Sequence, residues 1–146
     1  MAEKKYTHQD GFRAPFYMDN PGCYIWCKNI YGHDQMCFTI LIDWEKKEEL
    51  DRLKRIVDLL NGKEQRPFKY VGYNIEHDLI GVGDTKEDAA NPLLLTRGWG
   101  YLTGQGALAL PPKEAREIQV EFMKWALSRL KDSDEPGYEN IEKIEE

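Results

Sequence analysis

Short apolar runs separated by turn residues fill most of the chain outside two helical stretches. The runs are rich in β-branched and aromatic residues, and Asp, Asn, Pro, Gly and His gather between them, which is typical of strands joined by tight turns. Five such runs are present, over residues 23–27, 36–42, 68–75, 79–82 and 92–96. The pattern predicts an antiparallel sheet of about five strands.

Two stretches have apolar residues at helical spacing and predict helices over about 45–61 and 112–131. The first has Asn61-Gly62 as a stop signal, and the second opens with Pro111-Pro112, where proline is tolerated. The apolar stripe of the second helix is wide, which indicates contact on two sides, with a sheet and with either another helix or another subunit. These elements predict an α+β fold in which the sheet packs against two amphipathic helices, and we expect a homo-oligomer.

The ends of the chain differ from its middle. Residues 1–15 are polar and mixed, and they predict a loosely structured arm. Residues 132–146 are acidic and contain Pro-Gly, so they predict a disordered tail. One domain over residues 1–131 is therefore expected, which is an ordinary size for a domain.

The 146 residues carry a net charge of −6, which disfavours general binding to nucleic-acid backbones. No apolar run is long enough to span a membrane, and no signal peptide is recognisable at the N-terminus. The three Cys are therefore expected to be free thiols in a reducing compartment, so the pattern predicts a cytoplasmic protein that does not bind membranes. No motif predicts a cofactor.

A metal site is one interpretation of Cys23, Cys27, His33 and Cys37, whose order is close to that of a zinc knuckle. The spacing matches no standard pattern. If residues 23–27 form a strand, about 13 Å of chain separates the first two thiols, whereas ligands of one zinc ion lie within about 4 Å of each other. Buried free thiols are the alternative that we expect.

Each histidine precedes an aspartate by one or two residues, and a carboxylate can orient a histidine as a base or a metal ligand. The three pairs are His8 and Asp10, His33 and Asp34, and His77 and Asp78. A small His/Asp-dependent hydrolase or metalloenzyme is therefore an alternative function. No nucleophile motif accompanies any pair, so an enzyme is not our first expectation.

Residues 97–106 are unusual because four of the ten are glycine. They match neither a P-loop nor a dinucleotide-binding fingerprint. We predict a ligand site in which Trp99 and Tyr101 stack on a planar group while Arg97 and Thr103 hold a phosphate. The alternative is a structural crossover that packs Trp99 and Leu102 beneath the last helix.

The same segment carries a family resemblance. The string Arg97-Gly-Trp-Gly-Tyr-Leu-Thr-Gly, then Gly106-Ala-Leu-Ala-Leu-Pro111, and residues 114–122 resemble the C-terminal block of small uncharacterised proteins carried by bacteriophages and integrated elements of gut bacteria. Residues 56–62 are similar to their middle segment, so the likeness covers about half the chain. The resemblance implies a phage-type accessory protein, and such proteins are commonly inhibitors, sponges or regulators of host systems. It transfers no site residues.

Together these features predict a non-enzymatic, phage-type binding protein that engages a small nucleotide-like ligand or a host protein, for example as an inhibitor of host defence. The alternatives are the His/Asp enzyme and a structural or assembly protein.

Overall fold

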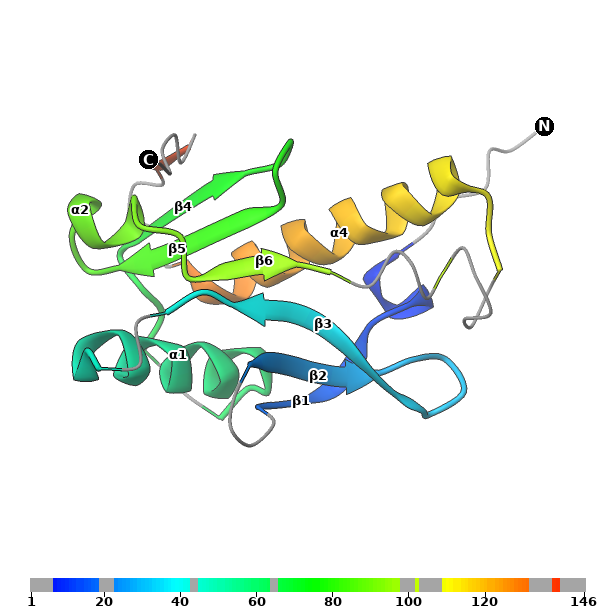
Figure 1. The fold of residues 1–146 in the computed structure, drawn as a ribbon, viewed down its shortest axis with the longest axis horizontal. Helices are drawn as coiled ribbons and strands as arrows, with labels where there is room; N and C mark the ends of the chain where they lie inside the picture. The colour runs from blue at the N-terminus through cyan, green and yellow to red at the C-terminus, as the bar shows by residue number, and fades with distance from the viewer. Residues whose placement is uncertain are drawn as a thin grey trace.

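A computed structural model describes residues 7–18, 23–42, 45–63, 66–97, 102, 109–131 and 138–139. It has an α+β fold in which one mixed sheet packs against helices, which confirms the predicted fold class (Figure 1). The strands are β1 (Arg13–Met18), β2 (Tyr24–Lys28), β3 (Asp34–Ile40), β4 (Tyr70–Asn74), β5 (Leu79–Gly83), β6 (Leu94–Thr96) and β7 (Tyr138–Glu139). The helices are η1 (His8–Asp10), α1 (Lys47–Leu60), α2 (Lys86–Ala89) and α4 (Pro112–Leu130).

The strands lie in the order β1-β2-β3-β6-β5-β4-β7. The first six pair antiparallel, and the two-residue β7 joins β4 in parallel. The prediction of about five strands thus falls short, because β1 and β7 were not expected. Helices α1 and α4 confirm the two predicted helices, and their ends differ from the predicted ones by at most two residues.

One face of the sheet and the two long helices enclose the core. Alternate strand residues point to this face, including Ile25, Phe38, Ile80 and Leu94, all fully buried. Phe122 of α4 packs against Phe38 with ring centroids 5.2 Å apart. The face is therefore closed by side chains from both halves of the chain.

The opposite face is covered only in part. On β5, Gly81 and Gly83 alternate with the core residues Ile80 and Val82, so they face the other way. A Cβ on Gly81 would lie 2.4 Å from the carbonyl oxygen of Ala89, which places the segment after β5 directly against the strand. Among the described residues, no helix covers the same face of β1, β2 and β3, which we call the open face.

Helix α1 ends as the sequence predicted. Gly62 has φ +76°, a backbone conformation that favours glycine. Its N–H donates to the Leu59 carbonyl at 3.1 Å, and the Lys63 N–H donates to the Asp58 carbonyl at 2.7 Å. These two bonds form a Schellman motif, which satisfies carbonyl groups at the helix end.

The N-terminal arm is more ordered than expected over its described part. Residues 8–10 form η1 and residues 13–15 belong to β1. Phe12 is fully buried, and its ring stacks on Phe122 with centroids 4.3 Å apart. The C-terminal segment differs from expectation at residues 138–139, which form β7.

The wide apolar stripe of α4 has an explanation within the chain. The helix contacts η1 and α1 as well as the core side of the sheet. Trp125 at the edge of the stripe stacks on His8, with ring centroids 4.3 Å apart. The width of the stripe therefore no longer argues for a second subunit.

Candidate ligand site on the open face

Arg97 is the only one of the four predicted ligand residues that the structure describes. It follows β6, and its backbone N–H donates to the Cys37 carbonyl at 2.8 Å. Its guanidinium donates to the hydroxyl of Thr39 at 3.3 Å and is exposed. Trp99, Tyr101 and Thr103 lie outside the described residues, so their predicted role stays a prediction.

Leu102 of the same segment has a structural role. It is fully buried, and a Cβ on Gly11 would lie 2.9 Å from Leu102 Cδ2 and 3.2 Å from Ile118 Cγ2. The Leu102 side chain thus packs close to Gly11, beside Ile118 of α4. This part of the glycine-rich segment is architecture, as the alternative interpretation proposed for Leu102.

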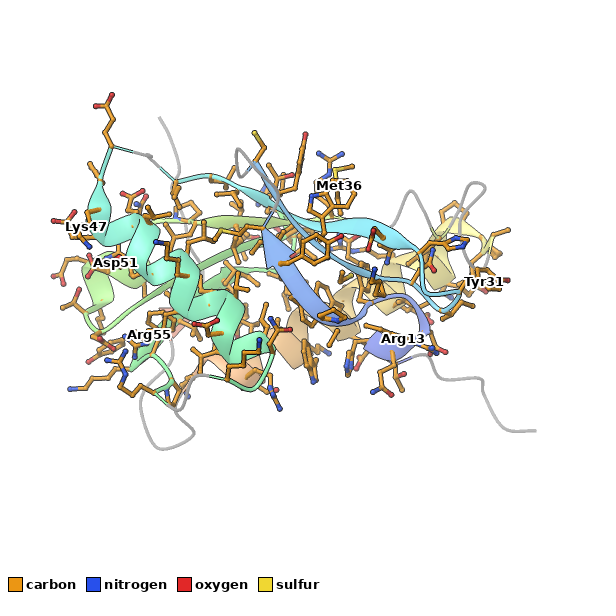
Figure 2. The ribbon with its side chains drawn as sticks, turned by 90° about the horizontal axis from the view of Figure 1, so that it is seen from below. Arg13, Tyr31, Met36, Lys47, Asp51 and Arg55 are labelled. Carbon is orange, nitrogen blue, oxygen red and sulfur yellow. The ribbon has the colours of Figure 1, made fainter. Side chains whose placement is uncertain are left out.

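Cross-strand register assembles an aromatic and apolar surface beside Arg97. Trp26 lies opposite Tyr17 on one side and opposite Met36 on the other, and Thr39 lies between Tyr24 and Leu95. Directly opposed residues share a face. Figure 2 shows Met36 projecting upward from the sheet. The open face therefore presents three aromatic rings, a methionine and a leucine around the Arg97–Thr39 contact.

These side chains are neither buried like a core nor fully exposed. Tyr17 is 36% exposed, and Tyr24, Trp26, Met36 and Leu95 have intermediate exposure. The rings of Tyr24 and Trp26 meet edge to face at 6.4 Å. Edge-to-face contact is one of the preferred geometries of aromatic pairs.

The indole N–H of Trp26 is buried and has no hydrogen-bond partner in the described part of the chain. A buried donor without an acceptor costs free energy, and such groups are uncommon in folded proteins. Trp26 therefore carries an unsatisfied donor beneath the aromatic part of the open face.

A polar network marks the end of the open face nearest the β2–β3 hairpin. Asp34 accepts a hydrogen bond from Lys28 and another from the Tyr17 hydroxyl. These two bonds lower the pKa of Asp34 below its ordinary value. Desolvation and the bond to Asp34 raise the pKa of Tyr17 to about 12. Tyr17 is thus a neutral donor at physiological pH, and Lys28 and Asp34 neutralise each other.

The carboxylates of two of the predicted His/Asp pairs are bound to other side chains. His33 and His77 are both exposed. Asp34 is engaged by Lys28 and Tyr17, and Asp78 accepts a bond from Arg116 at 2.5 Å. The bonds described for these two carboxylates are thus made to Lys28, Tyr17 and Arg116.

The third histidine, His8, packs against an aromatic ring. Its imidazole stacks on Trp125, and burial lowers the pKa of His8 against the opposing influence of Asp10 and Glu121. This environment suits a neutral packing residue.

The four candidate metal ligands lie in different environments. Cys27 and Cys37 are fully buried, whereas Cys23 and His33 are exposed. The Cys37 thiol donates to the Ile25 carbonyl at 3.4 Å. Within the described ranges, no group of three or more His, Cys, Asp or Glu side chains is arranged to hold a metal ion.

The sequence analysis did not predict that Tyr17, Tyr24 and Trp26 belong to this site. Tyr24 and Trp26 stand two residues apart in a predicted strand, and alternation alone indicates that they share one face. That Arg97 reaches this face depends on the pairing of β3 with β6, which joins residues about sixty positions apart. The missing information was strand order.

The chain matches no protein-family model, and neither the curated proteins nor the solved structures contain a match to it. None of the helices described here is long and apolar enough to cross a membrane.

Proposed function

We propose that this protein is a non-enzymatic, phage-type accessory protein that binds a small nucleotide-like ligand on the open face. The observation that carries the proposal is the position of Arg97, an exposed cation held beside an aromatic sheet face by the Thr39 hydroxyl. The ligand that fits this chemistry has a planar apolar part and an anionic group close to it.

The cation supports the anionic part of such a ligand. Arg97 contacts a neutral hydroxyl, so the guanidinium keeps donors for a phosphate, which it can bind with two parallel hydrogen bonds. The chain has a net charge of −6, and a local cation on an acidic protein favours a small anion over an extended nucleic-acid backbone.

The rings support the planar part. Tyr24 and Trp26 lie on the same face as Thr39, the residue that Arg97 contacts. Aromatic side chains stack on nucleobases with about 1–3 kcal/mol for each base.

We also propose that the protein binds its ligand without converting it chemically. The carboxylates nearest His33 and His77 are bound to other side chains, which favours sequestration of a ligand over its hydrolysis. The resemblance of the segment after β6 to small phage-borne proteins supports an inhibitor or sponge role.

Calorimetric titration with a panel of nucleoside mono-, di- and triphosphates and cyclic nucleotides tests the proposal. Arg97→Gln should weaken binding at least tenfold, because a hydrogen bond to a charged group contributes about 1.5–3 kcal/mol. Trp26→Leu should weaken it as well. Lys54→Gln, which removes an exposed cation from α1, is the matched control and should bind as the unchanged protein does.

Two outcomes would redirect the proposal. If no nucleotide binds, the ligand is not nucleotide-like, and a host protein becomes the partner to seek on the open face. If a nucleotide binds but chromatography recovers it chemically altered, the non-enzymatic assignment is wrong.

A further inference from the structure

Tyr24 and Trp26, which lie next to each other on the open face, have crossed rings. Their ring centroids are 6.4 Å apart and their planes meet at 78°. A flat group that stacks on one ring is therefore nearly perpendicular to the other ring and cannot stack on it as well. A single nucleobase can use only one of the two aromatic surfaces, so a ligand that stacks on both needs two separate planar groups.

Arg97 joins the open face at a level between the two rings. Its backbone N–H donates to the carbonyl of Cys37 at 2.8 Å. On β3, Cys37 lies between the residue opposite Trp26 and the residue opposite Tyr24. From this level the guanidinium reaches the hydroxyl of Thr39. The cation is thus placed for the phosphate that joins a nucleoside on Tyr24 to a second nucleoside on Trp26.

We infer that the ligand of the open face is a dinucleotide, in which one phosphodiester joins two nucleosides and each base stacks on its own ring. The inference rests on the proposed function, since it requires that the open face binds a nucleotide-like ligand. Successive bases of a stacked strand lie about 3.4 Å apart, whereas the two rings lie 6.4 Å apart. The two bases are therefore unstacked from each other, as in single-stranded ligands whose bases spread onto aromatic side chains.

The charges of the open face favour a short ligand with one phosphodiester. Arg97 is exposed and contacts a neutral hydroxyl, so its charge is available to an anion. At the end of β2, Lys28 is paired with Asp34, and this pair adds no net charge. A phosphodiester carries one negative charge, which matches one guanidinium. Each further phosphate of a longer strand would meet a chain whose net charge is −6.

The first test compares ligands of increasing length on the unchanged protein by calorimetric titration, so it does not depend on how any variant folds. The dinucleoside monophosphate ApA should bind at least about fivefold more tightly than AMP, because it adds a second stacked base. AMP carries more negative charge than ApA, so charge alone predicts the opposite order. The trinucleotide ApApA should bind within about twofold of ApA, because the same two rings accept only two bases.

The outcomes separate this inference from the proposed function. If AMP binds as tightly as ApA or more tightly, the dinucleotide is overturned and the proposed function stands. If affinity rises again from ApA to ApApA beyond that limit, the face binds a longer single strand, which also overturns the dinucleotide. If neither AMP nor ApA binds, the proposed function and this inference fail together.

The second test removes one ring from the full chain. Tyr24→Leu keeps an apolar side chain in β2 but removes its stacking surface, so the preference for ApA over AMP should disappear. Tyr31→Leu is the matched control, since it removes an exposed tyrosine from the tip of the β2–β3 hairpin, away from Met36 (Figure 2). This control should keep the full preference. A folded Tyr24→Leu protein, as judged by circular dichroism, that still prefers ApA overturns the inference.

Discussion

The side-chain amide of Asn61 makes two hydrogen bonds to the backbone of Phe16, accepting from its N–H at 2.8 Å and donating to its carbonyl at 2.7 Å. Asn61 is the residue at the C-terminal end of α1, and Phe16 is the buried residue of the edge strand β1. The amide thus takes the place of a peptide group from a neighbouring strand. It joins the N-terminal segment to the helix that closes the core.

Replacing Asn61 tests this relationship. Asn61→Ala leaves two partly buried backbone groups of Phe16 without a partner, so the free energy of unfolding should fall by about 1–3 kcal/mol. Urea unfolding measures the loss. Asn91→Ala, which truncates an exposed amide, should change stability by less than about 0.5 kcal/mol. Equal effects of the two substitutions would mean that the pairing of Asn61 with Phe16 contributes nothing.

Gly81 is a position at which the backbone of the crossover after β5 lies directly against the sheet. A Cβ there would lie 2.4 Å from the Ala89 carbonyl oxygen and 2.5 Å from that of Asn91, and neither backbone atom can rotate away. Gly81→Ala should therefore lower the free energy of unfolding by about 3 kcal/mol, the upper end of the usual range for overpacking.

The control for this substitution is a glycine with open space around it. Gly32 has φ +80° and no atom within 4 Å of its added Cβ, so Gly32→Ala should cost only about 1 kcal/mol of backbone strain. Thermal unfolding followed by circular dichroism compares the two. A smaller loss for Gly81→Ala than for Gly32→Ala would contradict the close packing of this crossover.

The helices and most strands were predictable because their signals are local. The stop at Asn61-Gly62 encodes a Schellman motif that needs only glycine at a positive φ. Strand β1 was missed because only Phe16 of its six residues is buried, so no alternation marks it. An edge strand held by a side chain from another element leaves little trace in its own sequence.

Of the residues in the candidate site, only Arg97 was predicted from the sequence. Arg97 drew attention through the glycine-rich segment around it, but the surface that it joins is built from Tyr24, Trp26 and Met36 on other strands. Their half-exposed state depends on which helices cover which face. That information is global, since it follows from strand order and from the path of the crossover after β5.

His8 should make stability depend on pH. Burial lowers its pKa in the folded protein, so the unfolded chain binds the proton more readily. The unfolded state therefore holds more protons below pH about 6.5, and stability should fall as the pH drops through this range. His8→Phe should keep the stacking on Trp125 and reduce the loss of stability between pH 7 and 5.

Denaturant unfolding at a series of pH values measures this effect. Asp10 and Glu121 partly offset the burial of His8, and Arg129 also lies over the Trp125 ring, with its guanidinium carbon 5.6 Å from the centroid. Glu121→Gln should therefore steepen the fall, because it removes one anion that favours the protonated imidazole. If the unchanged protein and His8→Phe lose the same stability on acidification, His8 is not the group responsible.

The three thiols should differ in reactivity according to their burial. Cys23 is exposed, whereas Cys27 and Cys37 are fully buried, and desolvation, followed by the hydrogen bond with Cys27, raises the pKa of Cys37 well above its ordinary value. Because the thiolate is the reactive form, a disulfide reagent should modify one thiol of the native protein quickly and the other two only on unfolding. Cys23→Ser should abolish the fast phase, and its remaining thiols should react at the rate of global opening. A second fast thiol would show that β2 and β3 open locally. Release of zinc on modification would support the metal-site hypothesis, which the burial of Cys27 and Cys37 argues against.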